Sequence, residues 1–262
     1  VDSLIQLATT RQIPLEKFIS FLENAVTEKY RELPDANLQA RAVLNRDTGE
    51  MQIHAPLYDE NGIYTHSVTL EPEGFNADRI VRKEIKLRMR QQKDAEIVQE
   101  FSTNVGDVIS GVVQQGKDPN LVDVKLADGV EGFIPSQEQV PGEIYQHGMR
   151  IKCFVVSVRK GNKGPQIILS RTHPGLVKGL FELEAPEVLQ GVVEIVAVAR
   201  ESGHRTKIAV LSHDPQISPK GTCIGPMGAR VRNVMNELGG EKIDIVDFSL
   251  DPVIFISNAL SP

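Results

Sequence analysis

The strongest constraint on the fold lies in the middle of the chain, where short apolar segments alternate with turn residues. Five such segments occupy residues 108–113, 121–126, 132–135, 151–158 and 166–170. Their length and spacing are typical of short β-strands. Five short strands in so little chain fit a small closed barrel, because closure removes the exposed strand edges that an open sheet would leave. We therefore predict an all-β barrel in this part of the chain.

The residues before this barrel predict a small α+β domain. Pro14 is well placed at the start of a helix, and apolar side chains recur at helical spacing from Leu15 to Val26. A polar turn at residues 45–50 separates two segments, 38–44 and 51–54, which alternate as the strands of a hairpin do. A second, longer helix is expected at about residues 75–101.

This second helix is expected to have one basic face. Apolar residues, among them Ile80, Leu87 and Ala95, cover one side of the helix. The opposite side carries Arg79, Arg82, Lys83, Lys86, Arg90 and Lys93. A solvated helix face is the ordinary interpretation of such a pattern. Because the surrounding segment is rich in acidic residues, a contact surface for an acidic protein or for RNA is the alternative.

The residues after the barrel predict an α/β domain. The expected order is a helix near 176–183, a strand pair at 192–199 and 206–211, two helices around a tight turn, a strand at 242–248 and a last helix at about 251–260. The chain is therefore multidomain, and its 262 residues suggest two or three compact domains.

The tight turn between the two helices is Gly225-Pro226-Met227-Gly228. Two glycines three residues apart usually mark only a turn. Here they follow a short apolar helix and open an amphipathic one, so free backbone N–H groups and the positive helix end point at one spot. Glycine also lets a sugar-phosphate backbone approach the main chain. Because Pro226 and Met227 carry no charge, the cations of this predicted phosphate site must be Lys220, Arg230 and Arg232.

The overall charge, taken alone, disfavours a nucleic-acid partner. The net charge is -6, whereas phosphate attraction needs Lys and Arg near the backbone. The charge is unevenly distributed, however, and residues 200–232 contain only two acidic residues beside Arg200, Arg205, Lys207, Lys220, Arg230 and Arg232. Acidic surface elsewhere can suppress non-specific binding without cancelling this basic patch.

Several other classes of protein are disfavoured by the sequence. No segment approaches the ~18 consecutive apolar residues of a membrane span, and residues 1–10 lack a signal-peptide pattern, so a cytoplasmic protein is expected. Cys153 and Cys223 form neither a disulfide framework nor a metal cluster, and we expect both in the core. The six histidines show no spacing typical of a catalytic triad or a metal site, and neither a P-loop nor GxGxxG is present. We expect no enzyme activity, no metal and no cofactor.

Two parts of the chain resemble known RNA-binding domains. Residues 106–113, 129–135, 148–151 and 168–171 are similar to the S1 domain, an OB-fold whose aromatic and basic side chains contact bases and phosphates. The strand at 121–126 lacks an aromatic residue, so Phe133 is the clearest stacking candidate, with a place in the core as the alternative. The turn from Gly225 to Gly228, in its helical context, resembles the GxxG motif with which KH domains clamp about four nucleotides.

Longer runs resemble one family, the NusA-type transcription elongation and termination factors. They are residues 138–143, 169–174, 180–184, 193–201, 236–245 and 258–262. The resemblance implies an N-terminal domain at 1–102 that binds RNA polymerase, an S1 domain at 103–172 and a KH domain at 173–262 that hold nascent single-stranded RNA. It also implies a role in pausing, termination and antitermination with other Nus factors. Members normally carry a second KH domain, so a truncated form is expected. We also expect the chain to be a monomer.

The resemblance gives roles to the candidate residues. It implies that the basic face of the second helix contacts RNA polymerase. The residues expected to contact RNA are Lys220, Ile224, Gly225, Pro226, Met227, Gly228, Arg230, Arg232 and Phe133. The alternatives are a ribosome-associated or RNA-processing protein with S1 and KH domains. A phosphorolytic exoribonuclease carries both domains too, but it places KH before S1 and attaches them to large catalytic domains. Binding to RNA polymerase would separate these alternatives.

Overall fold

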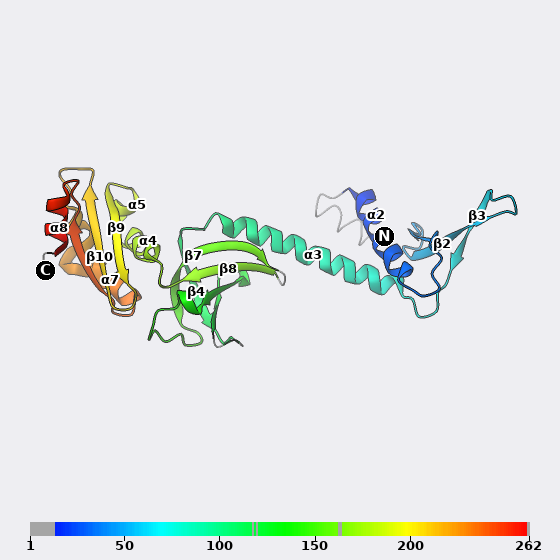
Figure 1. Ribbon diagram of the computed structural model, residues 1–262, viewed down its shortest axis with the longest axis horizontal. Helices are drawn as coiled ribbons and strands as arrows, with labels where there is room; N and C mark the ends of the chain where they lie inside the picture. Colours follow the sequence, from blue (N-terminus) through cyan, green and yellow to red (C-terminus); the bar gives the residue numbers. More distant parts are fainter. Residues whose placement is uncertain (1–13, 117, 119, 162–163, 261–262) are drawn as a thin grey trace. The chain divides into compact units, whose positions relative to one another are not determined.

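The computed structural model describes residues 14–260 except 117, 119, 162 and 163 (Figure 1). Its contacts divide the chain into two compact units, Val1–Lys93 and Asp94–Pro262. The predicted domain boundaries at 102 and 172 therefore stay a prediction. Among the described residues, no helix combines the length and the apolar character needed to cross a membrane.

The first unit packs a helix, α2 (Leu15–Arg31), on a three-stranded antiparallel sheet. The sheet order is β1 (Arg41–Leu44), β2 (Met51–Tyr58) and β3 (Tyr64–Leu70). The predicted hairpin is confirmed, since β1 pairs with β2 around the polar turn. Leu22 and Val26 of α2 are fully buried and meet the inward side of the sheet. The sequence pattern did not predict β3.

The predicted basic helix is α3 (Ala77–Ser102). Ile80, Val81 and Ile85 pack against the core of the first unit, whereas Ile97 and Phe101 join the core of the barrel. Leu87 and Ala95, which the sequence analysis placed on the apolar side of the helix, are exposed, because the helix extends beyond the core that its first turns cover. The six predicted basic side chains are all exposed: Arg79, Arg82, Lys83, Lys86, Arg90 and Lys93.

The second unit contains the predicted closed barrel. Its strands are β4 (Val108–Gln114), β5 (Leu121–Lys125), β6 (Glu131–Pro135), β7 (Arg150–Gly161) and β8 (Gly164–Ser170). They close in the order β4-β5-β6-β8-β7, with β6 parallel to β8 and the other pairs antiparallel. Short 3-10 helices at Ala127–Gly129 and Ser136–Glu138 flank β6. The barrel predicted from the sequence is thus confirmed.

The rest of the second unit is the predicted α/β domain. Helices α4 (Pro174–Glu184) and α5 (Pro186–Leu189) precede β9 (Val193–Glu201) and β10 (Arg205–Ser212). Then come α6 (Pro219–Ile224), a 3-10 turn (Pro226–Gly228), α7 (Ala229–Glu237), β11 (Lys242–Asp247) and α8 (Pro252–Leu260). The sheet order is β11-β10-β9, with β10 parallel to β11. The helices α4, α6 and α7 share one core with this sheet.

Both cysteines lie in these cores, as the sequence predicted. Cys153 is buried in the barrel and Cys223 in the α/β domain. Burial raises the pKa of the Cys153 thiol to about 12 and that of Cys223 to about 11. Both side chains therefore behave as small apolar residues and not as reactive thiolates.

Candidate nucleic-acid interface

The turn between α6 and α7 has a backbone that few residues can adopt. Gly225 has φ 71° and ψ 175°, and Gly228 has φ 73° and ψ 20°. Between them, Met227 has φ 51°, and it is the one non-glycine residue with positive φ in the described part of the chain. Its side chain is 93% exposed, so no core contact holds it in this conformation. Such local strain is typical of functional sites.

The N-terminus of α7 is open to a ligand. Its N-cap is Gly228, which offers no side chain to accept hydrogen bonds from the first N–H groups of the helix. Those donors and the positive end of the helix dipole therefore face the turn without a protein side chain to satisfy them. This is the geometry in which a helix start binds a phosphate.

The two arginines that follow the turn have different surroundings. A Cβ on Gly228 would lie 3.2 Å from Arg232 Nη1, so this guanidinium lies beside the exposed main chain. Arg230 instead covers Gly225 with its aliphatic carbons, and its Nη1 donates to Thr222 O at 2.9 Å and to Glu187 Oε2 at 3.0 Å. Arg232 is thus the more exposed of the two arginines, while Arg230 also holds the turn in shape.

A groove of about 660 Å³ begins next to the turn, between α6, β11 and the end of α8. Its apolar lining comes from Ile224, Val231, Ile243 and Ile245, and its cations are Arg205, Lys207 and Lys220. Arg205 pairs with Asp244 at 2.6 Å, and Lys220 Nζ lies 3.8 Å from Asp247 Oδ2. Lys207 donates to the carbonyl oxygen of Ala259. An apolar floor with cationic edges suits flat bases joined by phosphates.

Of the residues that line this groove, the sequence analysis had singled out Lys220 and Ile224 as candidate RNA contacts and had placed Arg205 and Lys207 in the basic patch, but it missed Ile243 and Ile245. The alternation of β11 carried a usable signal, because Ile243 and Ile245 share one side of a strand. What the sequence could not supply is the parallel pairing that places Lys207 of β10 opposite Asp244 of β11. That pairing brings two distant segments to the same groove.

Phe133 lies on the outer side of the barrel. Its neighbours in β6, Gly132 and Ile134, point inward and are buried, whereas Phe133 is half-buried and takes no part in the barrel core. It pairs with Asp123 of β5 and Ile168 of β8. Phe133 is therefore not part of the barrel core within the described residues, and its role in stacking stays a prediction.

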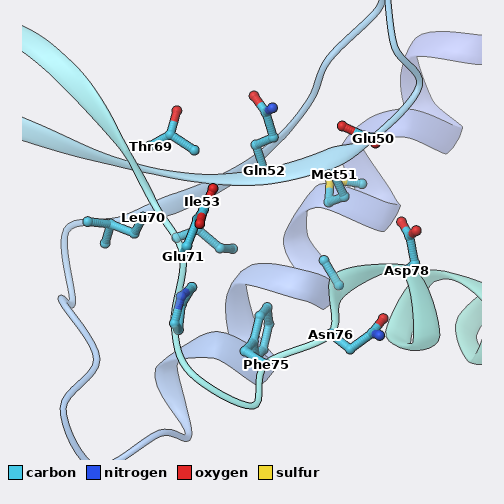
Figure 2. Close-up of a pocket in the computed structure, with 12 residues that line it drawn as sticks. Glu50, Met51, Gln52, Ile53, Thr69, Leu70, Glu71, Phe75, Asn76 and Asp78 are labelled. Carbon is cyan, nitrogen blue, oxygen red and sulfur yellow. The ribbon is translucent and has the colours of Figure 1, made fainter.

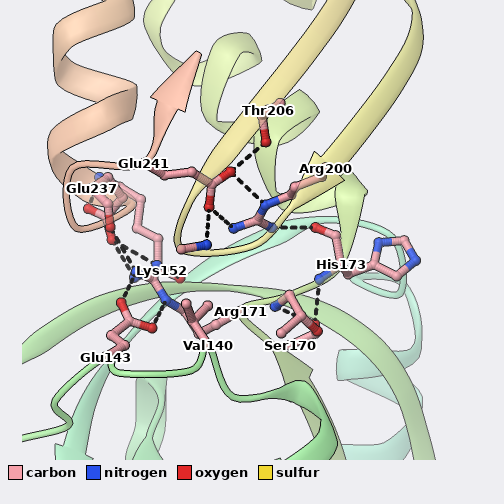
Figure 3. A network of polar contacts seen from close by, with 12 residues as sticks. Val140, Glu143, Lys152, Ser170, Arg171, His173, Arg200, Thr206, Glu237 and Glu241 are labelled. Atoms are coloured by element: carbon pink, nitrogen blue, oxygen red, sulfur yellow. Dashed lines mark hydrogen bonds and ion pairs between the residues drawn. The ribbon is translucent and has the colours of Figure 1, made fainter.

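A buried polar network joins the barrel to the α/β domain (Figure 3). The Arg171 side chain is only 1% exposed and bonds the Glu143 carboxylate, Lys152 O at 2.8 Å and Glu237 O at 2.8 Å. Lys152 N also donates to Glu237 Oε1 at 3.0 Å. Glu237 ends α7, the helix that starts at the glycine turn. The network therefore fixes that helix to the barrel.

A second buried pair supports the sheet beside this junction. Arg200 donates to both oxygens of Glu241 at 2.9 Å, and Thr206 and the Gly203 N–H donate to the same carboxylate. Burial alone raises the pKa of Glu241, but these hydrogen bonds outweigh it and hold the pKa below its usual range. At the junction itself the His173 ring stacks on Phe154 at 4.1 Å.

The described residues contain no group of three or more His, Cys, Asp or Glu side chains able to hold a metal ion. A closed five-stranded barrel followed by an α/β unit with an open GxxG turn defines the class of S1 and KH domain proteins. A family described as "NusA-like first KH domain" matches residues 171–248 of the chain.

Relatives from several bacteria carry the name "Transcription termination/antitermination protein NusA". The protein from Mycobacterium tuberculosis is 44% identical over 268 residues, which cover 99% of this chain and 77% of that protein. The Bacillus subtilis protein is 38% identical over 286 residues, covering 100% and 76%. The Thermus thermophilus protein is 43% identical over 182 residues, covering 70% and 47%. The chain belongs to the NusA family, and the resemblance predicted from the sequence is confirmed.

Proposed function

We propose that this chain is a transcription elongation factor of the NusA type. Residues 1–102 bind RNA polymerase, while 103–172 and 173–262 bind nascent single-stranded RNA. Because it binds both the polymerase and the nascent RNA, the factor modulates pausing, termination and antitermination together with other Nus factors. It acts as a cytoplasmic monomer and catalyses no reaction of its own. Membership of the NusA family and the geometry of the glycine turn support this proposal.

The uncapped N-terminus of α7 is the observation that most supports RNA binding. A phosphate accepts hydrogen bonds from its first N–H groups, and Arg232 neutralises the charge. Ile224 and Lys220, which line the groove, contact the RNA strand where it enters the groove. Phe133 stacks on a base at the barrel. The proposed RNA-contacting set is Lys220, Ile224, Gly225, Pro226, Met227, Gly228, Arg230, Arg232 and Phe133.

The direct test combines two titrations of the whole chain. Single-stranded RNA is titrated at about 50 mM and about 200 mM salt. The affinity should be lower at the higher salt concentration, because the release of counterions from the RNA then contributes less to binding. Bacterial core RNA polymerase is titrated separately. Binding to both supports the proposal. Binding to RNA without binding to polymerase would instead favour a ribosome-associated or RNA-processing protein.

Charge reversal on α3 tests the polymerase contact. Glutamate at Arg82, Lys86 and Arg90 should weaken binding to core polymerase roughly tenfold or more, because a complementary surface would become repulsive. The helix should stay folded, since these side chains are exposed and Ile80, Val81 and Ile85 keep their core contacts. The measurement is the dissociation constant for polymerase, with circular dichroism to follow helix content.

The matched control for α3 moves the charge reversal to other exposed arginines of the same unit. Arg31→Glu with Arg41→Glu changes the net charge in the same direction on α2 and β1. It should leave polymerase binding close to wild type. If all these variants bind equally well, the basic face of α3 is merely solvated.

Loss of the Phe133 ring should weaken RNA binding. Base stacking on an aromatic side chain contributes about 1–3 kcal/mol per base, so Phe133→Ala is expected to lower RNA affinity at least about fivefold. Phe133→Trp keeps an aromatic face and should retain most of the affinity. Equal affinity of the alanine variant and wild type, measured by fluorescence anisotropy, would exclude Phe133 from the interface.

A further inference from the structure

A hollow of the first unit is a poor place for RNA. It has a volume of about 340 Å³ and lies between the β2 and β3 segments and the start of α3 (Figure 2). The charged residues that line it are Glu50, Glu71 and Asp78, so its field repels phosphates. The second unit, which contains the glycine turn and Phe133, is better suited to further contacts with RNA.

An aromatic stack lies where the barrel meets the α/β domain. The ring of His173, the residue before α4, lies on the Phe154 ring of β7, with 4.1 Å between the ring centroids and 7° between the ring planes. Gly175 leaves room for this stack, because a Cβ there would collide with the Phe154 ring. His173 is nevertheless exposed. The ring face that Phe154 leaves uncovered is therefore the one open to a flat ligand.

Hydrogen bonds fix His173 in this position. Its Nδ1 accepts from the Gly175 N–H at 3.0 Å, and its own N–H donates to Ser170 Oγ at 2.8 Å. Its carbonyl oxygen accepts from Arg200 at 3.0 Å. Figure 3 shows the ring directed away from the network around Arg171 and Arg200. The ring is thus oriented before any ligand arrives, which lowers the ordering cost of binding.

The bond from Gly175 also determines which ring nitrogen carries the proton. Because Nδ1 of His173 is an acceptor, the neutral imidazole has its proton on Nε2 and presents a donor at that edge. Capping of α4 does not by itself call for this ring, since Ser, Thr, Asp and Asn are the preferred N-cap residues. An exposed aromatic side chain at this position therefore suits a ligand as well as the helix.

His173 lies near the proposed stacking residue of the barrel. Phe133 pairs with Ile168 of β8, and Ser170 follows two residues later on the same side of that strand. With about 4.8 Å between strands and about 6.6 Å for two residues along a strand, the Cα atoms of Phe133 and Ser170 are roughly 8 Å apart. Ser170 in turn contacts His173. A single strand stacked on Phe133 can therefore reach His173.

We propose that His173 is a further RNA-binding residue, whose exposed ring face stacks on a base where the single strand passes from the barrel to the α/β domain. Every base has a π-face, so this contact tolerates different sequences. The Nε2–H donates to an oxygen of the same RNA. This inference rests on the proposed binding of RNA by residues 103–262 and deepens it.

The test separates the two roles of the His173 side chain in the whole chain. His173→Phe keeps an aromatic face but loses the acceptor for the Gly175 N–H. His173→Asn keeps an acceptor, since asparagine is a preferred N-cap residue, but loses the ring. Stacking predicts that the asparagine variant binds single-stranded RNA about fivefold or more weakly than wild type, whereas the phenylalanine variant stays within about twofold. A residue that serves only as a cap would give the reverse order.

A tryptophan at the same position provides a second measurement. The chain contains no tryptophan, so His173→Trp introduces a single fluorescent reporter. Its fluorescence should be quenched when single-stranded RNA is added, because a base stacks on the indole. His213→Trp, at another exposed histidine of the same unit, is the control and should be quenched much less. Equal quenching at the two positions, or none at either, would overturn the proposal.

The outcomes separate this inference from the proposed function. Thermal unfolding of each variant shows whether a loss of affinity comes from a loss of fold. If His173→Asn binds RNA as wild type does while Phe133→Ala binds weakly, the inference fails and the proposed function stands. If His173→Asn weakens binding to core RNA polymerase and not to RNA, the ring contacts protein and the inference is overturned. If the wild-type chain does not bind RNA, both fail.

Discussion

Gly228→Asp is expected to lower affinity for single-stranded RNA by roughly tenfold to a hundredfold. The new carboxylate would stand at the start of α7, where the proposed phosphate accepts backbone hydrogen bonds. It would also lie beside Arg232 Nη1, which is 3.2 Å from the position of the added Cβ, and would pair with that cation. Hydrogen bonds to a charged group contribute about 1.5–3 kcal/mol each, which corresponds to this range of affinities.

Gly228→Asn is the matched control for this prediction. Gly228 has φ 73° and ψ 20°, a left-handed conformation that Asn and Asp both tolerate better than other residues. The asparagine variant therefore has nearly the same shape and backbone without the negative charge. It should keep most of the RNA affinity. Equal losses in the two variants, or no loss in either, would contradict the phosphate clamp.

Gly225 is a poorer position for the same experiment. Its φ of 71° and ψ of 175° fall in a region that is essentially restricted to glycine. A Cβ there would also lie 2.6 Å from Cγ of Arg230, which shapes the turn. Aspartate at both Gly225 and Gly228, the change that the motif alone suggests, would mix loss of phosphate binding with distortion of the turn. The single change at Gly228 separates the two.

The sequence predicted the elements whose apolar pattern is local. The five barrel strands and the helices α2, α3, α4 and α7 all carry clear periodicity, and each formed where expected. β3 was missed because it is mostly polar and exposed from Tyr64 to Ser67, so it lacks the alternation of a half-buried strand. It is held by pairing with β2, which a local pattern does not reveal.

The candidate site was predicted in part for the same reason. The glycine turn is a local motif, and its place before α7 followed from the sequence. The difference between Arg230 and Arg232 could not be predicted, because Glu187, the partner of Arg230, lies in a short helix that is distant in sequence. The contacts of Arg171 with Glu143 and Glu237 depend on how the barrel packs on the α/β domain. Such long-range partners appear only in the folded chain.

Arg171→Met is expected to destabilise the second unit by about 3–5 kcal/mol. The guanidinium is 1% exposed, and its removal leaves Glu143 and Glu237, 12% and 22% exposed, without their shared cation. It also leaves the carbonyl oxygens of Lys152 and Glu237 without this donor. Removing one partner from a buried ionic network is costly because the remaining charges stay desolvated. Methionine fills similar space, so the effect reports lost charge and hydrogen bonds more than a cavity.

The loss should be greatest where the network joins the barrel to α7. Hydrogen exchange is expected to increase in β7 and at the end of α7, because Lys152 and Glu237 belong to these elements. RNA affinity should also fall, since α7 would no longer hold the glycine turn in a fixed relation to Phe133. Arg205→Met is the control, because it breaks an exposed pair with Asp244 and should change stability little.

A second variant identifies the source of the destabilisation. Arg171→Met combined with Glu143→Gln removes one of the uncompensated carboxylates, so it should recover part of the lost stability. Calorimetry measures the thermal unfolding of each variant, and it is analysed for more than one transition because the chain divides into two compact units. If Arg171→Met unfolds at the temperature of wild type, or if the added Glu143→Gln lowers that temperature further, the network does not hold the barrel and α7 together.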